Sequence, residues 1–196
     1  MTVEVRSLID PEERWAAIPA LSDLRIAVFR SWPYLYDGTA EYEAEYLAEF
    51  VREPGSVLVV ACDAGAIIGA STASPLTGQK PEIQDPFRVK GINAAQIFYF
   101  GESVLLPQYQ GQGIGHQFFD AREDAARAAG AHQTAFCAVI RPDDHPMRPE
   151  APRDLNPFWR ARGYTPVDGL TGTLKWQDLG DDFESPHHMQ FWMCDL

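Results

Sequence analysis

The chain has 196 residues, 45% of them hydrophobic and 22% charged, and a formal net charge of −12 at pH 7. This length and composition predict one globular domain over residues 1–196, and no apolar run is long enough to span a bilayer. The strong negative charge excludes non-specific binding to nucleic acid or an anionic membrane surface, because phosphate contacts need clustered Lys and Arg.

The cysteines and the N-terminal residues indicate the cellular compartment of the protein. Cys62, Cys137 and Cys194 are odd in number and far apart, which is typical of reduced thiols and not of a disulfide framework or a zinc site. The first ten residues carry acids and lack the apolar core of a signal peptide. We therefore expect a cytoplasmic protein.

The first half of the chain predicts two helices among strands. Residues 3–9 alternate apolar and polar side chains like a half-buried strand, and residues 24–29 form a short helical pattern. Thr39 is the expected N-cap of a second helix that ends near residue 51. The β-rich runs 56–62 and 66–73 are separated by Asp-Ala-Gly, which indicates a hairpin.

The second half continues with strands and two more helices. The Pro- and Gly-rich stretch 75–93 predicts a long loop, and residues 95–106 predict a strand closed by Pro107. A glycine-rich turn and an amphipathic helix follow. The remaining expected elements are a strand (132–140), a loop (141–154), a short helix (155–163) and two strands (171–176 and 189–194). This order predicts a mixed α/β (α+β) fold, with a mostly antiparallel sheet of about seven strands flanked by about four helices.

The stretch "QYQGQGIGHQFFDA" places glycines between a strand and a helix N-terminus. Free backbone amides and the positive end of the helix dipole bind anions there, and glycines let a phosphate approach the backbone. A P-loop is excluded because Gly115 is followed by His116 and Gln117 instead of Lys and Ser/Thr. A dinucleotide fingerprint is disfavoured, because the glycines follow G-x-G-x-G and Ile140 leads into Arg141, with no acidic residue there.

This stretch resembles the pyrophosphate loop of the GNAT superfamily of acyl-CoA-dependent N-acyltransferases, Gln/Arg-x-x-Gly-x-Gly/Ala, through Gln110, Gly113 and Gly115. The later block "NPFWRARGYTPV" resembles a second segment of that family, in which a short helix with an aromatic residue precedes Gly and Phe or Tyr. The element order also agrees with that family. The resemblance implies a GNAT fold and an acyltransferase that uses acetyl-CoA.

The resemblance also implies how the donor is held. Backbone amides of the loop would bind the CoA pyrophosphate, and the backbone at the end of the preceding strand would hydrogen-bond the pantetheine arm. The loop residues are Gln110, Gly111, Gln112, Gly113, Ile114, Gly115 and His116, and the strand residues are Ser103, Val104 and Leu105. Gln110 stands where the family often has Arg, which leaves Arg122, Arg160 or Arg162 as candidates for the adenosine 3′-phosphate.

The expected catalytic residue is Glu102, which matches a position where several members of the family carry a catalytic carboxylate. An exposed strand residue without a catalytic role is the alternative. Trp159 stands where many members have a Tyr that protonates the leaving thiolate, so the general acid stays open between Tyr99, Tyr109 and solvent. Trp159 would pack on the pantetheine or close the pocket, Asn156 could hydrogen-bond the pantetheine, and Tyr164 is expected in the core.

The predicted function is transfer of an acetyl group from acetyl-CoA to a primary amine of a small molecule or peptide, by direct attack. Two alternatives stay open: a non-catalytic acyl-CoA sensor, and acetylation of a protein N-terminus or lysine. We expect no metal, since neither "DDHP" nor His187-His188 has ligand spacing. No nucleic acid or membrane partner is expected, and a homodimer is left open.

Overall fold

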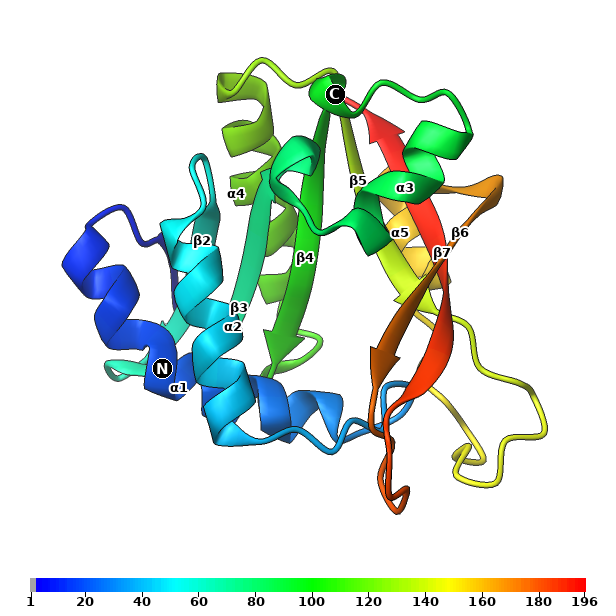
Figure 1. Cartoon of the computed structure of the whole chain (residues 1–196). Helices are drawn as coiled ribbons and strands as arrows, with labels where there is room; N and C mark the ends of the chain where they lie inside the picture. Colours follow the sequence, from blue (N-terminus) through cyan, green and yellow to red (C-terminus); the bar gives the residue numbers. More distant parts are fainter. Residues whose placement is uncertain (1–2) are drawn as a thin grey trace.

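The computed structural model describes residues 3–196, and within these residues seven strands form one sheet in the order β1-β2-β3-β4-β5-β7-β6 (Figure 1). The strands are β1 (Glu4–Ser7), β2 (Val57–Asp63), β3 (Ala66–Pro75), β4 (Ile97–Leu105), β5 (Gln133–Val139), β6 (Thr165–Trp176) and β7 (Ser185–Asp195). Neighbours are antiparallel except β4 and β5, which are parallel. The predicted mixed, mostly antiparallel sheet is therefore confirmed.

Five helices cover this sheet in the described part of the chain, one more than expected. They are α1 (Pro11–Phe29), α2 (Ala40–Arg52), α3 (Pro81–Val89), α4 (Ile114–Ala128) and α5 (Asn156–Ala161). Hydrophobic clusters join α1, α2 and α3 to one face of the sheet, and α4 and α5 to the other (Figure 1). None of the helices within residues 3–196 combines the length and apolar character of a membrane span.

Two helices correct the sequence reading. The stretch 75–93 is not a long loop, because α3 occupies its centre and buries Ile83 and Phe87, which are four residues apart. Its first residue is Pro81, and proline fits the first turn of a helix although it also marks loops. Helix α1 begins at Pro11 and not near residue 24, because the Asp10 side chain caps the Glu12 amide at 2.8 Å.

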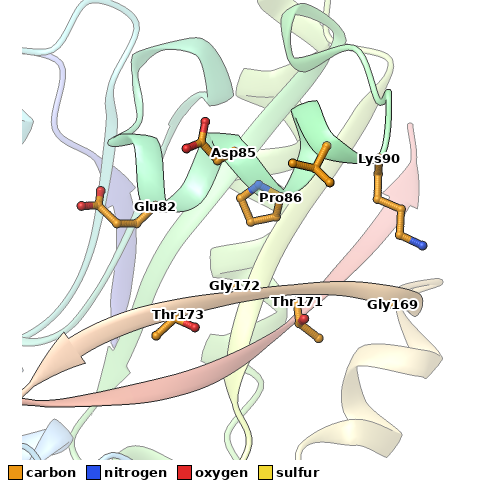
Figure 2. Close-up of a pocket in the computed structure, with 9 residues that line it drawn as sticks. Glu82, Asp85, Pro86, Lys90, Gly169, Thr171, Gly172 and Thr173 are labelled. Carbon is orange, nitrogen blue, oxygen red and sulfur yellow. The ribbon is translucent and has the colours of Figure 1, made fainter.

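The last two strands begin earlier than predicted, at Thr165 and Ser185 instead of residues 171 and 189. Polar residues and glycines obscure these starts in the sequence, whereas pairing between the two strands extends over both. Helix α3 packs against β6, the edge strand, and an open depression lies between them (Figure 2). The residues that line this depression include Glu82, Asp85, Lys90, Thr171 and Thr173.

A β-bulge divides β4 into two halves. Ala73 pairs with Phe100 and Ser71 with Ser103, so Gly101 and Glu102 together oppose the single residue Thr72. Phe98 and Phe100 pack on the α4 face, and a regular strand would place Glu102 on that face as well. The extra residue reverses the alternation, so that Glu102 and Val104 lie on the face covered by α1 and α2.

Arg122 of α4 holds this bulge from within the protein. Its side chain is 1% exposed, and its Nη1 donates to the carbonyl oxygens of Thr72 and Glu102, both at 3.3 Å. Thr72 Oγ1 also accepts the Glu102 amide at 3.1 Å. Burial lowers the pKa of the Arg122 guanidinium to about 10, because water is excluded from the charge. One buried cation and one hydroxyl thus satisfy the polar backbone groups that the bulge leaves unpaired.

A second buried arginine joins the loop between α1 and α2 to the far end of the sheet. Arg141, just after β5, forms an ion pair with Asp178 at 2.5 Å and donates to the carbonyl oxygens of Pro33 and Tyr34 at 2.7 and 2.6 Å. Trp176 Nε1 donates to Asp178 and to the Tyr34 carbonyl at 2.9 and 3.0 Å. These bonds fix the α1–α2 loop against the β6–β7 end.

Substitution of Gly101 by Ala tests the bulge. A Cβ at Gly101 would lie 2.5 Å from Thr72 Oγ1, so we expect a loss of about 1–3 kcal/mol in the free energy of unfolding. In a Thr72→Ala background the hydroxyl is absent, and the additional cost of Gly101→Ala should shrink. Urea denaturation of the four proteins measures this coupling, and equal costs in both backgrounds would contradict the assigned contact.

Substitution of Arg141 by Leu tests the second anchor. The change leaves a buried Asp178 carboxylate without its cation, so we expect a loss of roughly 3–5 kcal/mol by chemical denaturation. Arg148→Ala is the control, because the exposed pair of Arg148 with Asp143 should contribute less than about 1 kcal/mol. Similar losses in the two variants would rule out a special role for Arg141.

Candidate active site

Strands β4 and β5 separate toward their carboxyl ends and form a fork (Figure 1). Their parallel pairing covers only Ile97–Tyr99 of β4, while β4 continues to Leu105 and β5 to Val139. Beyond this pairing, β4 bonds to β3 on one side, and its other edge faces the fork. Backbone groups on such an edge can bind an extended, amide-bearing molecule as if it were another strand. Ser103, Val104 and Leu105 lie on this part of β4.

The glycine-rich turn connects β4 to α4 at the end of the strand. Gly111 and Gly113 have φ of +76° and +82°, which L side chains rarely adopt, and α4 begins at Ile114. Residues 111–113 are exposed, whereas the Ile114 side chain is buried in the core, so Ile114 presents only its backbone. The turn therefore places exposed backbone and a helix N-terminus at one end of β4, a geometry that suits an anion.

Glutamine side chains brace this turn. Gln110 Nε2 donates to the Leu105 carbonyl at 3.2 Å, and Gln112 Nε2 donates to the Gln108 carbonyl at 3.1 Å. The His116 amide donates to the Gly113 carbonyl at 3.0 Å. The predicted strand residues 103–105 and loop residues 110–116 thus lie along one segment of the chain, in which the Val104 and Ile114 side chains are buried in the core.

Helix α5 lies beside the start of α4, and the side chain that makes this contact is Phe158, not Trp159. The Phe158 ring lies 4.9 Å from the His116 ring, and a Cβ on Gly115 would lie 3.5 Å from Phe158. Trp159 packs on Phe136 and Trp192, with ring centroids 5.0 and 5.1 Å away. Sequence reasoning missed Phe158, although its neighbour in the "NPFW" block drew attention to this helix.

Asn156, at the start of α5, is exposed, and its backbone amide donates to Asp154 at 2.8 Å. Neither Asn156 nor Trp159 is brought against the glycine turn by the contacts described above. Their expected roles toward pantetheine stay predictions.

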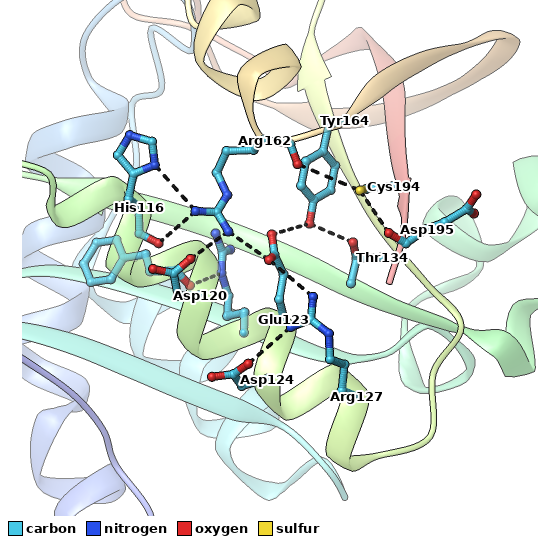
Figure 3. A network of polar contacts seen from close by, with 12 residues as sticks. His116, Asp120, Glu123, Asp124, Arg127, Thr134, Arg162, Tyr164, Cys194 and Asp195 are labelled. Atoms are coloured by element: carbon cyan, nitrogen blue, oxygen red, sulfur yellow. Dashed lines mark hydrogen bonds and ion pairs between the residues drawn. The ribbon is translucent and has the colours of Figure 1, made fainter.

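Arg162 and Tyr164 belong to a network that ties the end of α5 to α4 (Figure 3). Arg162 Nη2 lies 2.8 Å from both Asp120 and Glu123, and the Tyr164 hydroxyl is bonded to Thr134 at 2.7 Å. Tyr164 is fully buried, which confirms its place in the core. Arg162 is neutralised by two carboxylates, and the buried Arg122 is directed at the bulge, so neither is free to bind the 3′-phosphate.

Glu102 lies on the opposite face of the sheet from this network. Its Oε1 forms an ion pair with Arg25 Nη1 of α1 at 2.7 Å, and its Oε2 lies 3.5 Å from the Tyr46 hydroxyl of α2. Arg25 also pairs with Glu43, whose side chain is completely buried. The exposed-strand interpretation of Glu102 is wrong, because its side chain is only 7% exposed.

The charge balance of this cluster is negative. Burial lowers the pKa of Arg25, but the charges of Glu102 and Glu43 outweigh this effect and raise the pKa above its usual value. Two carboxylates thus share one permanent cation. The Arg25 guanidinium also lies over the Tyr46 ring, 4.5 Å from its centroid, which orients the cluster further.

Tyr46 lies beside Glu102, and Tyr34 and Tyr99 are two further phenols whose pKa is raised. Burial raises the pKa of Tyr34 and Tyr99, and the Glu102 charge together with burial raises that of Tyr46, so all three stay protonated at neutral pH. The Tyr99 hydroxyl lies 3.1 Å from Cys137 Sγ, where burial raises the thiol pKa to about 11. Tyr109 donates to Asp63 at 2.8 Å and is therefore engaged at the end of β2.

The depression at β6 and His187 of β7 lie on other elements than the fork, which β4 and β5 form. The depression in Figure 2 lies at β6, which β5 and β7 separate from β4 in the sheet. Within residues 3–196, no group of three His, Cys, Asp or Glu side chains could hold a metal ion. His187 stacks on Trp176, with ring centroids 3.8 Å apart, and belongs to the cluster around Asp178.

Several solved structures share this fold. A ribosomal-protein-alanine N-acetyltransferase from Brucella melitensis has a TM-score of 0.62 at 17% identity, over 98% of this chain and 99% of that one. The protein yncA from Salmonella typhimurium, solved with its cofactor acetyl-CoA, has a TM-score of 0.60 at 14% identity, over 100% of this chain and 95% of that one. A GNAT-family protein from Desulfovibrio desulfuricans has a TM-score of 0.59 at 14% identity, over 99% of both chains.

No curated protein matches the chain. The family model of the acetyltransferase (GNAT) family matches residues 21–149, a span that contains the bulge, the fork and the glycine turn. The resemblance of "QYQGQGIG" to the loop of this family therefore agrees with both the sequence match and the fold. The chain belongs to the GNAT family of acetyltransferases and is an acyltransferase.

Proposed function

We propose that this protein transfers the acetyl group of acetyl-CoA to a primary amine of a small molecule or peptide. The observation that carries the proposal is the placement of two features on β4. The glycine turn follows the end of the strand, and the buried carboxylate of Glu102 lies a few residues before that end. An anionic donor and a proton acceptor can therefore meet at the fork.

The donor would bind along β4 and the turn. Exposed amides of Gly111, Gln112 and Gly113 and the first turn of α4 suit the pyrophosphate, with Ile114, Gly115 and His116 acting through their backbone. The edge of β4 at Ser103–Leu105 suits the amides of pantetheine. The thioester would then lie in the fork near the bulge.

Glu102 would act as the general base. An alkylamine has a pKa near that of lysine, about 10.4, so most of it must lose a proton before it can attack. Arg25 engages Oε1, and the Tyr46 hydroxyl lies 3.5 Å from Oε2, so Oε2 would take this proton beside that phenol, directly or through water. The amine nitrogen then bonds to the acetyl carbon, the carbon–sulfur bond breaks, and the sulfur leaves as a thiolate that takes up a proton.

The acceptor would approach from the face of α1 and α2. That face presents Glu102 and the phenols of Tyr34 and Tyr46, and the Glu43–Arg25–Glu102 cluster carries one net negative charge. Negative charge and hydroxyl oxygens that can accept hydrogen bonds suit an ammonium group that becomes an amine. The overall net charge of −12 also favours the approach of a cationic acceptor.

Acetyl-CoA should raise the melting temperature of the protein, because a ligand that binds only the native state stabilises it. At 100 times its Kd the gain is about 2.7 kcal/mol, whereas NAD should have no effect. Absence of any shift with acetyl-CoA, measured by thermal denaturation, would refute the proposal. Thiol release with a panel of amines separates an enzyme from a sensor: stabilisation without turnover of any amine would mean that the chain only binds acyl-CoA.

Gly113→Ala should weaken this stabilisation, since it strains a turn that would contact the pyrophosphate. Gly130→Ala is a matched control, because Gly130 at the end of α4 also has a positive φ, +77°, and open space around a new Cβ. Both changes should cost about 1 kcal/mol of folding stability. Only Gly113→Ala should raise the Kd for acetyl-CoA, and an equal rise in both variants would exclude a local effect.

Glu102→Gln should lower kcat by roughly 10²- to 10⁴-fold at neutral pH, and the remaining rate should rise with pH as more amine loses its proton. The KM for acetyl-CoA should change little. Glu49→Gln is the control, because Glu49 is an exposed carboxylate of α2 that pairs with Lys80. Full activity of Glu102→Gln at every pH, measured by thiol release, would exclude Glu102 as the base.

A further inference from the structure

A phosphate site on this protein needs a local cation. The formal net charge is −12, and backbone amides supply only partial positive charge to a pyrophosphate. Two nearby arginines are already engaged: Arg162 faces Asp120 and Glu123, and Arg122 is buried at the bulge. Arg160, the third candidate, lies over the Trp192 ring of β7, 5.4 Å from its centroid.

Arg153 meets this need. It lies on the connection between β5 and α5, and its Nη1 donates to Gln110 Oε1 at the glycine turn. Asp154, the next residue, accepts the Asn156 amide at 2.8 Å and so anchors this part of the connection to the start of α5. Residues 43 positions apart are thereby brought together beside Gly111.

The Arg153 guanidinium is available to an anion. The ion pairs of residues 3–196 include the Arg148–Asp143 pair of the same connection, but none of them engages Arg153, whose side chain is exposed. An arginine has five N–H donors in a planar fork, and the contact with Gln110 uses one. The remaining donors suit the bidentate binding of a phosphate.

Gln110 positions this cation. Its Nε2 donates to the Leu105 carbonyl at the end of β4, while its Oε1 accepts from Arg153. One side chain thus links the strand that precedes the turn with Arg153. The guanidinium is held at Gln110, directly before the exposed residues 111–113.

We propose that Arg153 binds a phosphate group of the acyl donor and makes the protein select phosphorylated donors over the bare acetyl-pantetheine arm. This proposal rests on the proposed function, because it assumes that the donor lies along β4 and the turn. The group bound is either the pyrophosphate or the 3′-phosphate, which share the same anionic chemistry.

Arg153→Ala should raise the KM for acetyl-CoA about tenfold and leave kcat nearly unchanged, since the guanidinium lies outside the fork where the thioester reacts. The KM for S-acetyl-pantetheine, which has no phosphate, should be the same in both proteins. Arg148→Ala removes an equal charge from the same connection and should change neither KM. Steady-state thiol release with both donors measures these values.

A rescue separates charge from shape. In the double variant Gln110→Arg/Arg153→Ala, a guanidinium again lies beside Gly111, so the KM for acetyl-CoA should return toward that of the unchanged protein. The tenfold effect should also shrink at high ionic strength, because an exposed charge is screened by salt.

3′-Dephospho-acetyl-CoA identifies the phosphate: an effect of Arg153→Ala that persists with this donor assigns the pyrophosphate, and one that vanishes assigns the 3′-phosphate. An unchanged KM for acetyl-CoA, or an equal rise with S-acetyl-pantetheine, would overturn the proposal. Failure of the proposed function is a different result, in which the unchanged protein is neither stabilised by acetyl-CoA nor able to release its thiol.

Discussion

The β4 bulge is the constraint on which the candidate site depends. One extra residue opposite Thr72 reverses the alternation of the strand and moves the Glu102 side chain from the α4 face to the face of α1 and α2. Bulges disrupt a ladder of hydrogen bonds, and here Arg122 and the Thr72 hydroxyl satisfy the groups that are left. Burying an arginine without a partner is unfavourable. The bonds of the buried Arg122 to the main chain at Thr72 and Glu102 therefore indicate that the bulge geometry is firmly held.

The bulge also separates two kinds of chemistry along one strand. Toward its carboxyl end, β4 has a free edge in the fork. The exposed turn that follows has positive φ at Gly111 and Gly113, and its neutral backbone suits an anion. On the α1–α2 face, Glu43 and Glu102 share Arg25, which leaves a negative charge that suits a cation. Donor and acceptor would approach the fork from surfaces of opposite electrostatic character, and Arg153 would reinforce the donor side.

Much of this architecture could be predicted from local patterns. The glycine turn before an amphipathic helix, the Thr39 cap and the seven strands follow from residue spacing and turn chemistry, and the structure confirms them. Helix α3 was missed because Pro81 reads as a loop residue in isolation, although it fits the first turn of a helix. The full length of β6 was hidden because its pairing with β7, and not its own composition, sustains it.

The sequence by itself determined that a glycine-rich turn lies between a strand and a helix, since glycine content and helix periodicity are local properties. It also singled out Glu102 as a carboxylate near the end of that strand. Only the tertiary structure decided which face Glu102 occupies, that Arg25 and Tyr46 surround it, and that Phe158 and not Trp159 lies beside the turn. The position of Arg153 at Gln110 was likewise decided by folding. Contacts between residues tens of positions apart depend on packing and burial, which spacing along the chain does not encode.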